Sequence, residues 1–165
     1  MSRVYILILF LVGVPTSHTY AYTHVNGEKP LKLLLRINKP VIKYGKFPKL
    51  ELIITNESKK KIKILDITNR PDLQDNYGSV VFYKGGSSFS FNTTTISDPG
   101  AIGDNDFIEL SPNENIRIIL SDPPHDPREL RPGKYEVNFG YHSNPNVDNY
   151  ADYYESQRVG FTVKK

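Results

Sequence analysis

Three residue types are missing or nearly missing from this chain of 165 residues, which has no cysteine, no tryptophan and one methionine. Without cysteine the chain can form no disulfide, and it can supply neither a thiol nucleophile nor the ligands of an iron–sulfur cluster or a thiolate zinc site. Exported domains often rely on disulfides. A folded domain in this sequence must therefore be held together by its apolar interior, which a chain of this length is large enough to provide.

Long hydrophobic stretches are also scarce. The longest runs from Val4 to Val14 and has 11 residues, whereas a membrane-spanning helix needs about 20. It follows Arg3 and precedes a polar stretch with small residues at Thr19 and Ala21, which is the layout of a cleaved secretory signal. A membrane anchor or a buried strand is the alternative interpretation of this run.

The sequence thus predicts a signal peptide at residues 1–21, a polar leader at 22–30 and one domain at 31–165. We expect a secreted or periplasmic protein without stable membrane insertion. Neither sign of charge is in large excess, because 21 Lys and Arg face 18 Asp and Glu. Removing the signal peptide takes away only Arg3 and leaves 20 against 18. This balance argues against a nucleic-acid partner.

Short segments of alternating polar and apolar residues dominate the rest of the chain. Such a period of two residues is typical of strands with one buried face. The predicted strands are Leu31–Ile37, Lys49–Thr55, Lys61–Leu65, Ser79–Lys84, Asp106–Leu110, Asn115–Leu120, Lys134–Tyr141 and Arg158–Val163. A further strand through Phe89 and Phe91 is compatible with the pattern, and no segment shows a sustained helical period. The sequence therefore predicts an all-β, two-sheet antiparallel sandwich of about seven to nine strands.

The segment Leu130–Val137 resembles the entry to the sixth strand of immunoglobulin-like and fibronectin-like domains. In those domains a tight turn precedes a tyrosine, here Tyr135, which hydrogen-bonds back across the corner. Segments 50–56 and 107–115 are similar to the second strand and to a later hairpin of the same domains. The whole order is similar to the accessory sandwich of deuterolysin-type metallopeptidases and, more loosely, to bacterial sandwich-type proteinase inhibitors. The resemblance implies an immunoglobulin-like architecture and specifies no activity.

Catalytic motifs are hard to find. His24, His125 and His142 lie far from one another in the sequence, so the paired histidines of a zinc peptidase are missing. Residues 121–126 contain serine, aspartate and histidine, but in a proline-broken loop without a nucleophile elbow. The acidic residues offer no evident cleft for a carboxylate pair. We predict a protein that is not an enzyme and needs no cofactor, with a small hydrolase as a remaining alternative.

Two other local patterns have alternative interpretations. Residues 98–106 combine acidic side chains with glycines, which suits Ca²⁺, although local backbone hydrogen bonding explains them as well. Asn56 and Asn92 each begin a glycosylation sequon, which has meaning only in a eukaryotic source. We predict no metal site.

The most distinctive segment is the stretch 141–154, where tyrosines alternate with asparagine, serine and aspartate. This composition is typical of recognition loops, because tyrosine offers a large rigid contact area and the small polar residues adapt their hydrogen bonds. The alternative is that the tyrosines pack against the end of the sandwich. The predicted binding residues are Tyr141, Asn146, Asp148, Tyr150, Asp152, Tyr153 and Tyr154.

These residues favour a non-enzymatic binding or accessory module for a protein or carbohydrate ligand. A secreted proteinase inhibitor that inserts a long loop is the alternative. If Ser79–Lys84 is the fourth strand and Lys134–Tyr141 the sixth, the long connections 85–105 and 142–155 leave the sandwich at one end. The turn at 56–60 is expected at that same end.

Overall fold

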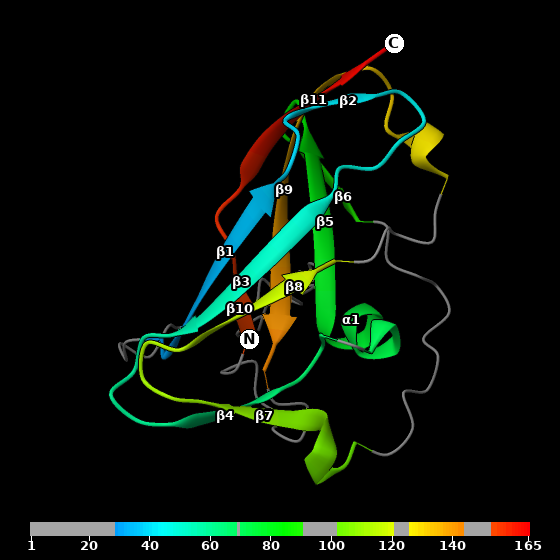
Figure 1. Cartoon of the computed structure of the whole chain (residues 1–165). Helices are drawn as coiled ribbons and strands as arrows, with labels where there is room; N and C mark the ends of the chain where they lie inside the picture. Colours follow the sequence, from blue (N-terminus) through cyan, green and yellow to red (C-terminus); the bar gives the residue numbers. More distant parts are fainter. Residues whose placement is uncertain (1–28, 69, 91–101, 121–125, 144–152) are drawn as a thin grey trace, which may run out of the picture.

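A computed structural model describes residues 29–68, 70–90, 102–120, 126–143 and 153–165 (Figure 1). Strands make up most of this part of the chain. They are β1 (Leu31–Ile37), β2 (Val41–Lys43), β3 (Leu50–Asn56), β4 (Ile62–Leu65), β5 (Gly78–Lys84), β6 (Ser87–Ser90), β7 (Phe107–Leu110), β8 (Asn115–Ile119), β9 (Gly133–His142), β10 (Tyr153–Glu155) and β11 (Val159–Lys164). The helical elements are α1 (Pro71–Tyr77) and two short 3₁₀ turns, η1 (Asp104–Asp106) and η2 (Pro127–Glu129).

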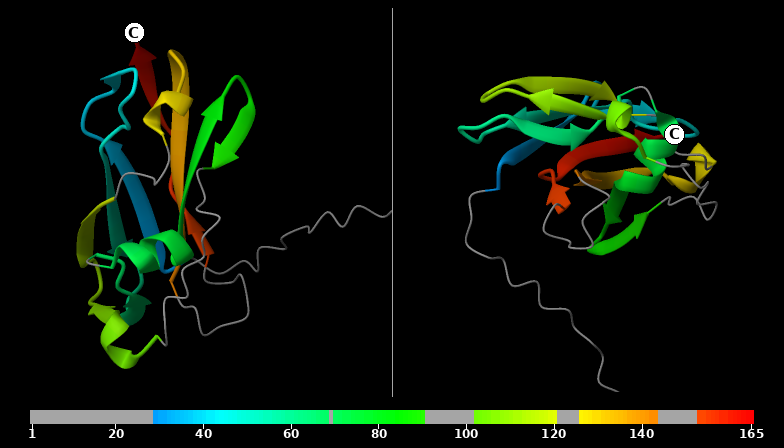
Figure 2. Two further views of the ribbon diagram at one scale, coloured as in Figure 1. Left: turned by 90° about the vertical axis from the view of Figure 1, so that its right-hand side faces the viewer. Right: turned by 90° about the horizontal axis from the view of Figure 1, so that it is seen from below.

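The strands form two facing sheets and a small third one. The first sheet has the order β1-β3-β8, and the second has the order β2-β11-β9-β5-β6 with β10 also paired to β9. Seen edge-on, the two sheets form the layers of a sandwich (Figure 2). The third sheet, β4-β7, lies at one end of them. This is the strand arrangement of an immunoglobulin-like sandwich, so the predicted fold class is confirmed.

Alternating residues of both sheets fill the space between the layers. In β1 the odd-numbered leucines are buried, and in β3 Leu52 and Ile54 are completely covered. Across the sandwich, Val137 and Phe139 of β9 point inward next to Phe82 of β5. With no disulfide available, burial of this apolar surface stabilises the fold.

The predicted tyrosine corner is present. Tyr135 is buried near the start of β9, and its hydroxyl donates to the Arg131 carbonyl oxygen at 2.6 Å. Lys84 Nζ donates to the same hydroxyl at 3.0 Å. The ring also stacks on Phe161 of β11, with ring centroids 5.4 Å apart. The corner therefore connects the segment before β9 with its two neighbouring strands, β5 through Lys84 and β11 through Phe161.

All eight strands predicted from alternation are present with ends shifted by at most one residue, and β6 contains Phe89 of the further strand, whose Phe91 lies outside the described residues. The sequence did not indicate β2 and β10, which have three residues each, because so short a segment shows no period. It also did not indicate α1, whose seven residues begin with Pro71 at the first turn. No helix among the described residues is long and apolar enough to cross a membrane.

One geometric expectation was wrong. β5 lies beside β9 in the second sheet and pairs with it antiparallel, with Gly78 opposite Tyr141 and Tyr83 opposite Glu136. The two strands therefore end at opposite ends of the sandwich, and the connections that follow them begin at opposite ends. The turn at 56–60 does lie at the end where β9 finishes (Figure 1).

Candidate functional site

The predicted recognition segment is only partly described. Asn146, Asp148, Tyr150 and Asp152 lie outside the described residues, and Tyr141, Tyr153 and Tyr154 lie within them. These three belong to β9 and β10, which pair with Tyr141 opposite Tyr154 and His142 opposite Tyr153. Because side chains alternate between the faces of a sheet, the register places Tyr141 and Tyr154 on one face and Tyr153 on the other.

Tyr141 and Tyr154 lie on the core side. Tyr141 is fully buried, Tyr154 is 4% exposed, and the Tyr141 hydroxyl donates to the Leu65 carbonyl oxygen at 2.6 Å. Burial raises the pKa of Tyr141 far above its usual value. These two rings offer no contact area to a partner. For Tyr141 and Tyr154 the recognition hypothesis is therefore wrong, and the alternative, packing against the sandwich, holds.

Tyr153 lies on the outer face of the second sheet, over Gly140. A β-carbon at position 140 would collide with the Tyr153 hydroxyl and come within 2.6 Å of Ser79 Oγ, so only glycine leaves room for the ring. The hydroxyl donates to Glu155 Oε1 at 2.9 Å, and the ring lies 4.8 Å from that of His142 between centroids. Partial burial, followed by the Glu155 contact, raises the pKa of Tyr153 to about 12.

The same outer face carries a shallow groove of about 550 Å³ at its other end. Its floor is formed by outward-facing residues of β9 and β11. Pro40 and Val41, at the start of β2, line one side, and Gly85 and Gly86 in the β5–β6 turn line the other. Both glycines have positive φ, 58° and 87°, which the tight two-residue turn requires. No other layer of described strands covers this face (Figure 2).

Tyr83 and Arg158 contact each other in the groove. The Arg158 guanidinium carbon lies 3.6 Å from the centre of the Tyr83 ring, and its Nη1 lies 3.7 Å from Glu136 Oε2. The Tyr83 hydroxyl donates to Asn138 Oδ1 at 3.4 Å. Asn138 is only 6% exposed although it points outward. The Arg158 side chain remains 53% exposed, so the groove presents a positioned cation.

The sequence does not indicate the outer face as a site. It predicts strands for four residues of this face, without a role for any of them: Tyr83, Glu136, Asn138 and Arg158. The one sequence feature that could have indicated this face is Asn138, a polar residue between Val137 and Phe139 whose side chain a strand directs to the outer face. What the sequence could not supply was the neighbour relation between β5, β9 and β11, which brings these side chains together.

The segment considered for Ca²⁺ uses its described carboxylates in other ways. Lys63 Nζ donates to Asp104 Oδ1 at 2.8 Å, and this hydrogen bond lowers the pKa of Asp104. Arg70 donates to Asp106 Oδ1 at 2.7 Å, and the Gly103 amide donates to Asp106 Oδ2 at 2.9 Å. No group of three His, Cys, Asp or Glu side chains in the described ranges is arranged to hold a metal ion.

The first sequon is unsuited to carry a glycan in this fold. Asn56 is fully buried, and its amide donates to the Lys60 and Leu110 carbonyl oxygens at 2.8 and 2.9 Å. Its Oδ1 accepts hydrogen bonds from the Ser58 amide and hydroxyl. The side chain therefore has a structural role. Asn92, of the second sequon, lies outside the described residues.

Comparisons with known proteins identify no relative by sequence. No family model matches the chain, and neither does any curated protein. Among solved structures, a CARDB domain from Pyrococcus furiosus is 14% identical with a TM-score of 0.39, over 81% of this chain and 94% of that one. The sporulation control protein Spo0M from Bacillus subtilis is 9% identical with a TM-score of 0.46, over 83% and 50%.

A third similar structure is the DNA-bound alkylpurine DNA glycosylase AlkC from Pseudomonas fluorescens. It is 11% identical with a TM-score of 0.42, and the match covers 82% of this chain and 31% of the glycosylase chain. This chain thus spans about a third of that protein. At these identities and TM-scores none of the likenesses bears on function. The resemblance to the sandwich of deuterolysin-type metallopeptidases stays a prediction.

Proposed function

We propose that this chain is an exported, non-enzymatic binding module whose ligand lies on the outer face of the second sheet. The groove beside Tyr83 and Arg158 is the centre of the proposed surface, and Tyr153 and His142 form its other end. The observation that carries the proposal is the positioned Arg158 guanidinium on the Tyr83 ring. Tyrosine and arginine are the residues that most often dominate binding energies in protein interfaces.

The ion pair in the groove supports a binding role. Arg158 and Glu136 are separated by 3.7 Å, and both side chains are more than half exposed. Such a pair adds little to stability in water. A ligand carboxylate could therefore take the guanidinium over from Glu136 at little cost, and Arg158 offers two parallel donors for it.

A protein is favoured over a carbohydrate as the ligand. Sugars bind by laying a ring face on an aromatic side chain, and a guanidinium already lies on the Tyr83 ring. The groove is also open and shallow, which suits a loop or an extended segment of a protein. Export rests on the signal-like residues 1–21, and the absence of an enzymatic function rests on the missing catalytic motifs.

The test is capture of partners from the extracellular or periplasmic fraction of the source organism by the immobilised protein, with identification by mass spectrometry. We expect Tyr83→Ala/Arg158→Ala to lose the captured protein while its far-ultraviolet circular dichroism stays unchanged. Arg158→Glu, which alters only an exposed side chain, should lose it as well.

The matched control changes the outer face of the first sheet. Leu34→Ala/Arg36→Ala removes an exposed apolar residue and a cation that has no ion-pair partner among the described residues. This variant should retain capture. Equal capture by all variants would contradict the proposal, and specific binding to a glycan array that Arg158→Glu abolishes would move the ligand from protein to carbohydrate.

A further inference from the structure

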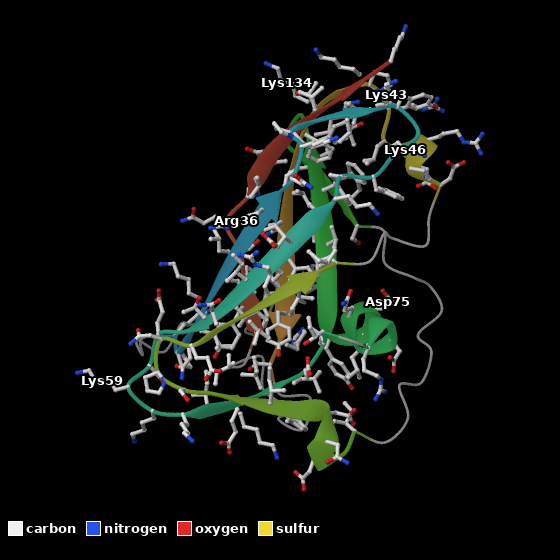
Figure 3. The ribbon with its side chains drawn as sticks, viewed as in Figure 1. Arg36, Lys43, Lys46, Lys59, Asp75 and Lys134 are labelled. Atoms are coloured by element: carbon white, nitrogen blue, oxygen red, sulfur yellow. The ribbon has the colours of Figure 1, made fainter. Side chains whose placement is uncertain are left out.

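One end of the sandwich gathers lysines that are far apart in the sequence. It lies where β2, the start of β9 and the end of β11 meet, at the top of Figure 3. We call this the basic end and define it by Lys43, Lys46, Lys134, Lys164 and Lys165, which are all exposed. Figure 3 shows Lys43, Lys46 and Lys134 around the same tip.

Strand pairing places these charges side by side. β2 and β11 run parallel with Lys43 opposite Lys164, so the two ammonium-bearing residues share a face of the sheet. One step further from the tip, Thr162 of β11 lies between Val41 on one side and Lys134 on the other. Like charges on neighbouring strands repel each other. The fold brings the cations together at a cost in stability.

Within the described part of the chain, none of the five lysines forms an ion pair. Asp126 lies at this end, but it is paired with Arg128 at 2.7 Å. The whole chain has a formal net charge of only +3, so five lysines without an ion pair at one tip are a local excess of positive charge.

Exposed apolar groups lie among the lysines. Four large hydrophobic residues of the described chain are exposed, and two of them, Val41 at 48% and Tyr44 at 36%, belong to this end. Arg131 donates to the Tyr44 hydroxyl at 3.2 Å, so the ring is held in position. Tyrosine prefers the headgroup level of a bilayer, and lysine stems lie along apolar surface while their charges stay in water.

From these observations we infer that the basic end docks on a bilayer surface that carries anionic headgroups, without inserting. The tip is formed by strand ends and turns and carries the exposed Val41 and Tyr44 among its lysines, which suits a flat surface whose charged layer covers an apolar one. The lysines of the tip act as point charges, whereas recognition of single phosphate groups more often uses the two-pronged guanidinium of arginine. The Arg131 guanidinium of this end is engaged with the Tyr44 hydroxyl. Lysines near an anionic surface attract it additively.

The test measures binding to phosphatidylglycerol/phosphatidylcholine vesicles by flotation, with pure phosphatidylcholine vesicles as the baseline. The protein is used in its processed form, purified after export, because an uncleaved apolar N-terminus would bind both kinds of vesicle. We expect binding to the anionic vesicles only, and weaker binding as salt is raised. Lys43→Gln/Lys46→Gln/Lys164→Gln should weaken it about a hundredfold, from roughly one kcal/mol for each lysine.

The matched control is Lys59→Gln/Lys60→Gln/Lys61→Gln. It removes the same charge from an exposed turn at the opposite end (Figure 3), and it should bind like the wild type. Tyr44→Ser should weaken binding to vesicles and leave binding to dextran sulfate beads unchanged. Three results would overturn the inference: no binding to anionic vesicles at low salt, equal losses in both triple variants, or equal effects of Tyr44→Ser on vesicles and beads.

Because Lys134 and Val41 border both the tip and the groove, the triple variant leaves them in place. If the triple variant loses vesicle binding but still captures the partner, the basic end binds vesicles and the groove binds the partner. A groove variant that loses partner capture but still binds vesicles would lead to the same assignment.

Discussion

The two ends of this sandwich use their polar groups in opposite ways. At the end that holds β4, β7 and α1, several polar side chains are engaged: Lys63 with Asp104, Arg70 with Asp72 and Asp106, and the buried Asn56 with three backbone groups and the Ser58 hydroxyl. The exposed lysines of the turn at 59–61 are the exception at this end. We call this the paired end. At the basic end the lysines have no such partners among the described residues.

The difference teaches where stability and function reside. Groups that are buried and fully hydrogen-bonded are expensive to change, because removal leaves their partners unsatisfied. Unpaired surface charges of one sign contribute nothing to stability and reduce it slightly by repulsion. The hydrogen-bonded groups of the paired end therefore add to the stability of the fold, whereas the unpaired lysines of the basic end can change or bind without loss of such contacts.

Replacing Asn56 should have the largest effect. Asn56→Ala removes the side-chain donor to the Leu110 carbonyl, the acceptor of the Ser58 amide and hydroxyl, and one of the two donors to the Lys60 carbonyl. We expect a loss of about 3 kcal/mol in the free energy of unfolding, from several unsatisfied groups at roughly 1 kcal/mol each. Urea denaturation followed by circular dichroism measures it. Asn115→Ala, an exposed asparagine in β8, is the control and should change little.

Acid should weaken the paired end by a smaller amount. The Arg70 hydrogen bond lowers the pKa of Asp72 in the folded protein, so this carboxylate stabilises the fold above its ordinary pKa and loses that contribution as pH falls through the lowered value. The melting temperature of the wild type should fall as the pH is lowered from about 5 to about 2, and Arg70→Gln should reduce this dependence.

A variant at the basic end separates the two ends in the acid experiment. Lys134→Gln removes a cation that has no acid partner in the described structure. Its acid dependence should therefore match that of the wild type. A weaker dependence of the melting temperature on pH in Lys134→Gln would show that the basic end also contains ion pairs. The difference between the two ends would then be wrong.

Charge reversal at the basic end should have the smallest effect and the opposite sign. Lys43→Glu places a carboxylate opposite Lys164 and replaces repulsion by attraction between neighbouring strands. We expect a gain of roughly 0.2–1 kcal/mol in the free energy of unfolding. Chemical denaturation at low and high salt measures it, and the gain should shrink at high salt. A loss of stability would mean that Lys43 has a structural partner.

The sequence predicted much of the fold and little of the site. Alternation located the eight principal strands, and Tyr135 indicated its corner correctly, because both signals are local. The place of Ser79–Lys84 next to β9 was not predictable, since nothing within a strand specifies its neighbours. For the same reason the tyrosines of the last connection could not be sorted into core and surface until the pairing of β9 with β10 was known.

By itself, the sequence determined the all-β class, the lack of any disulfide and the residues that share a strand face, because a period of two is written into the chain. The tertiary structure decided which face is buried and which strands are neighbours. That decision put Tyr141 in the core and Tyr153 outside, and it placed Arg158 on Tyr83. It also brought Lys43 beside Lys164, although 120 intervening residues separate them in the numbering. Strand pairing is a long-range choice made by the packing of the whole sandwich, so no local pattern records it.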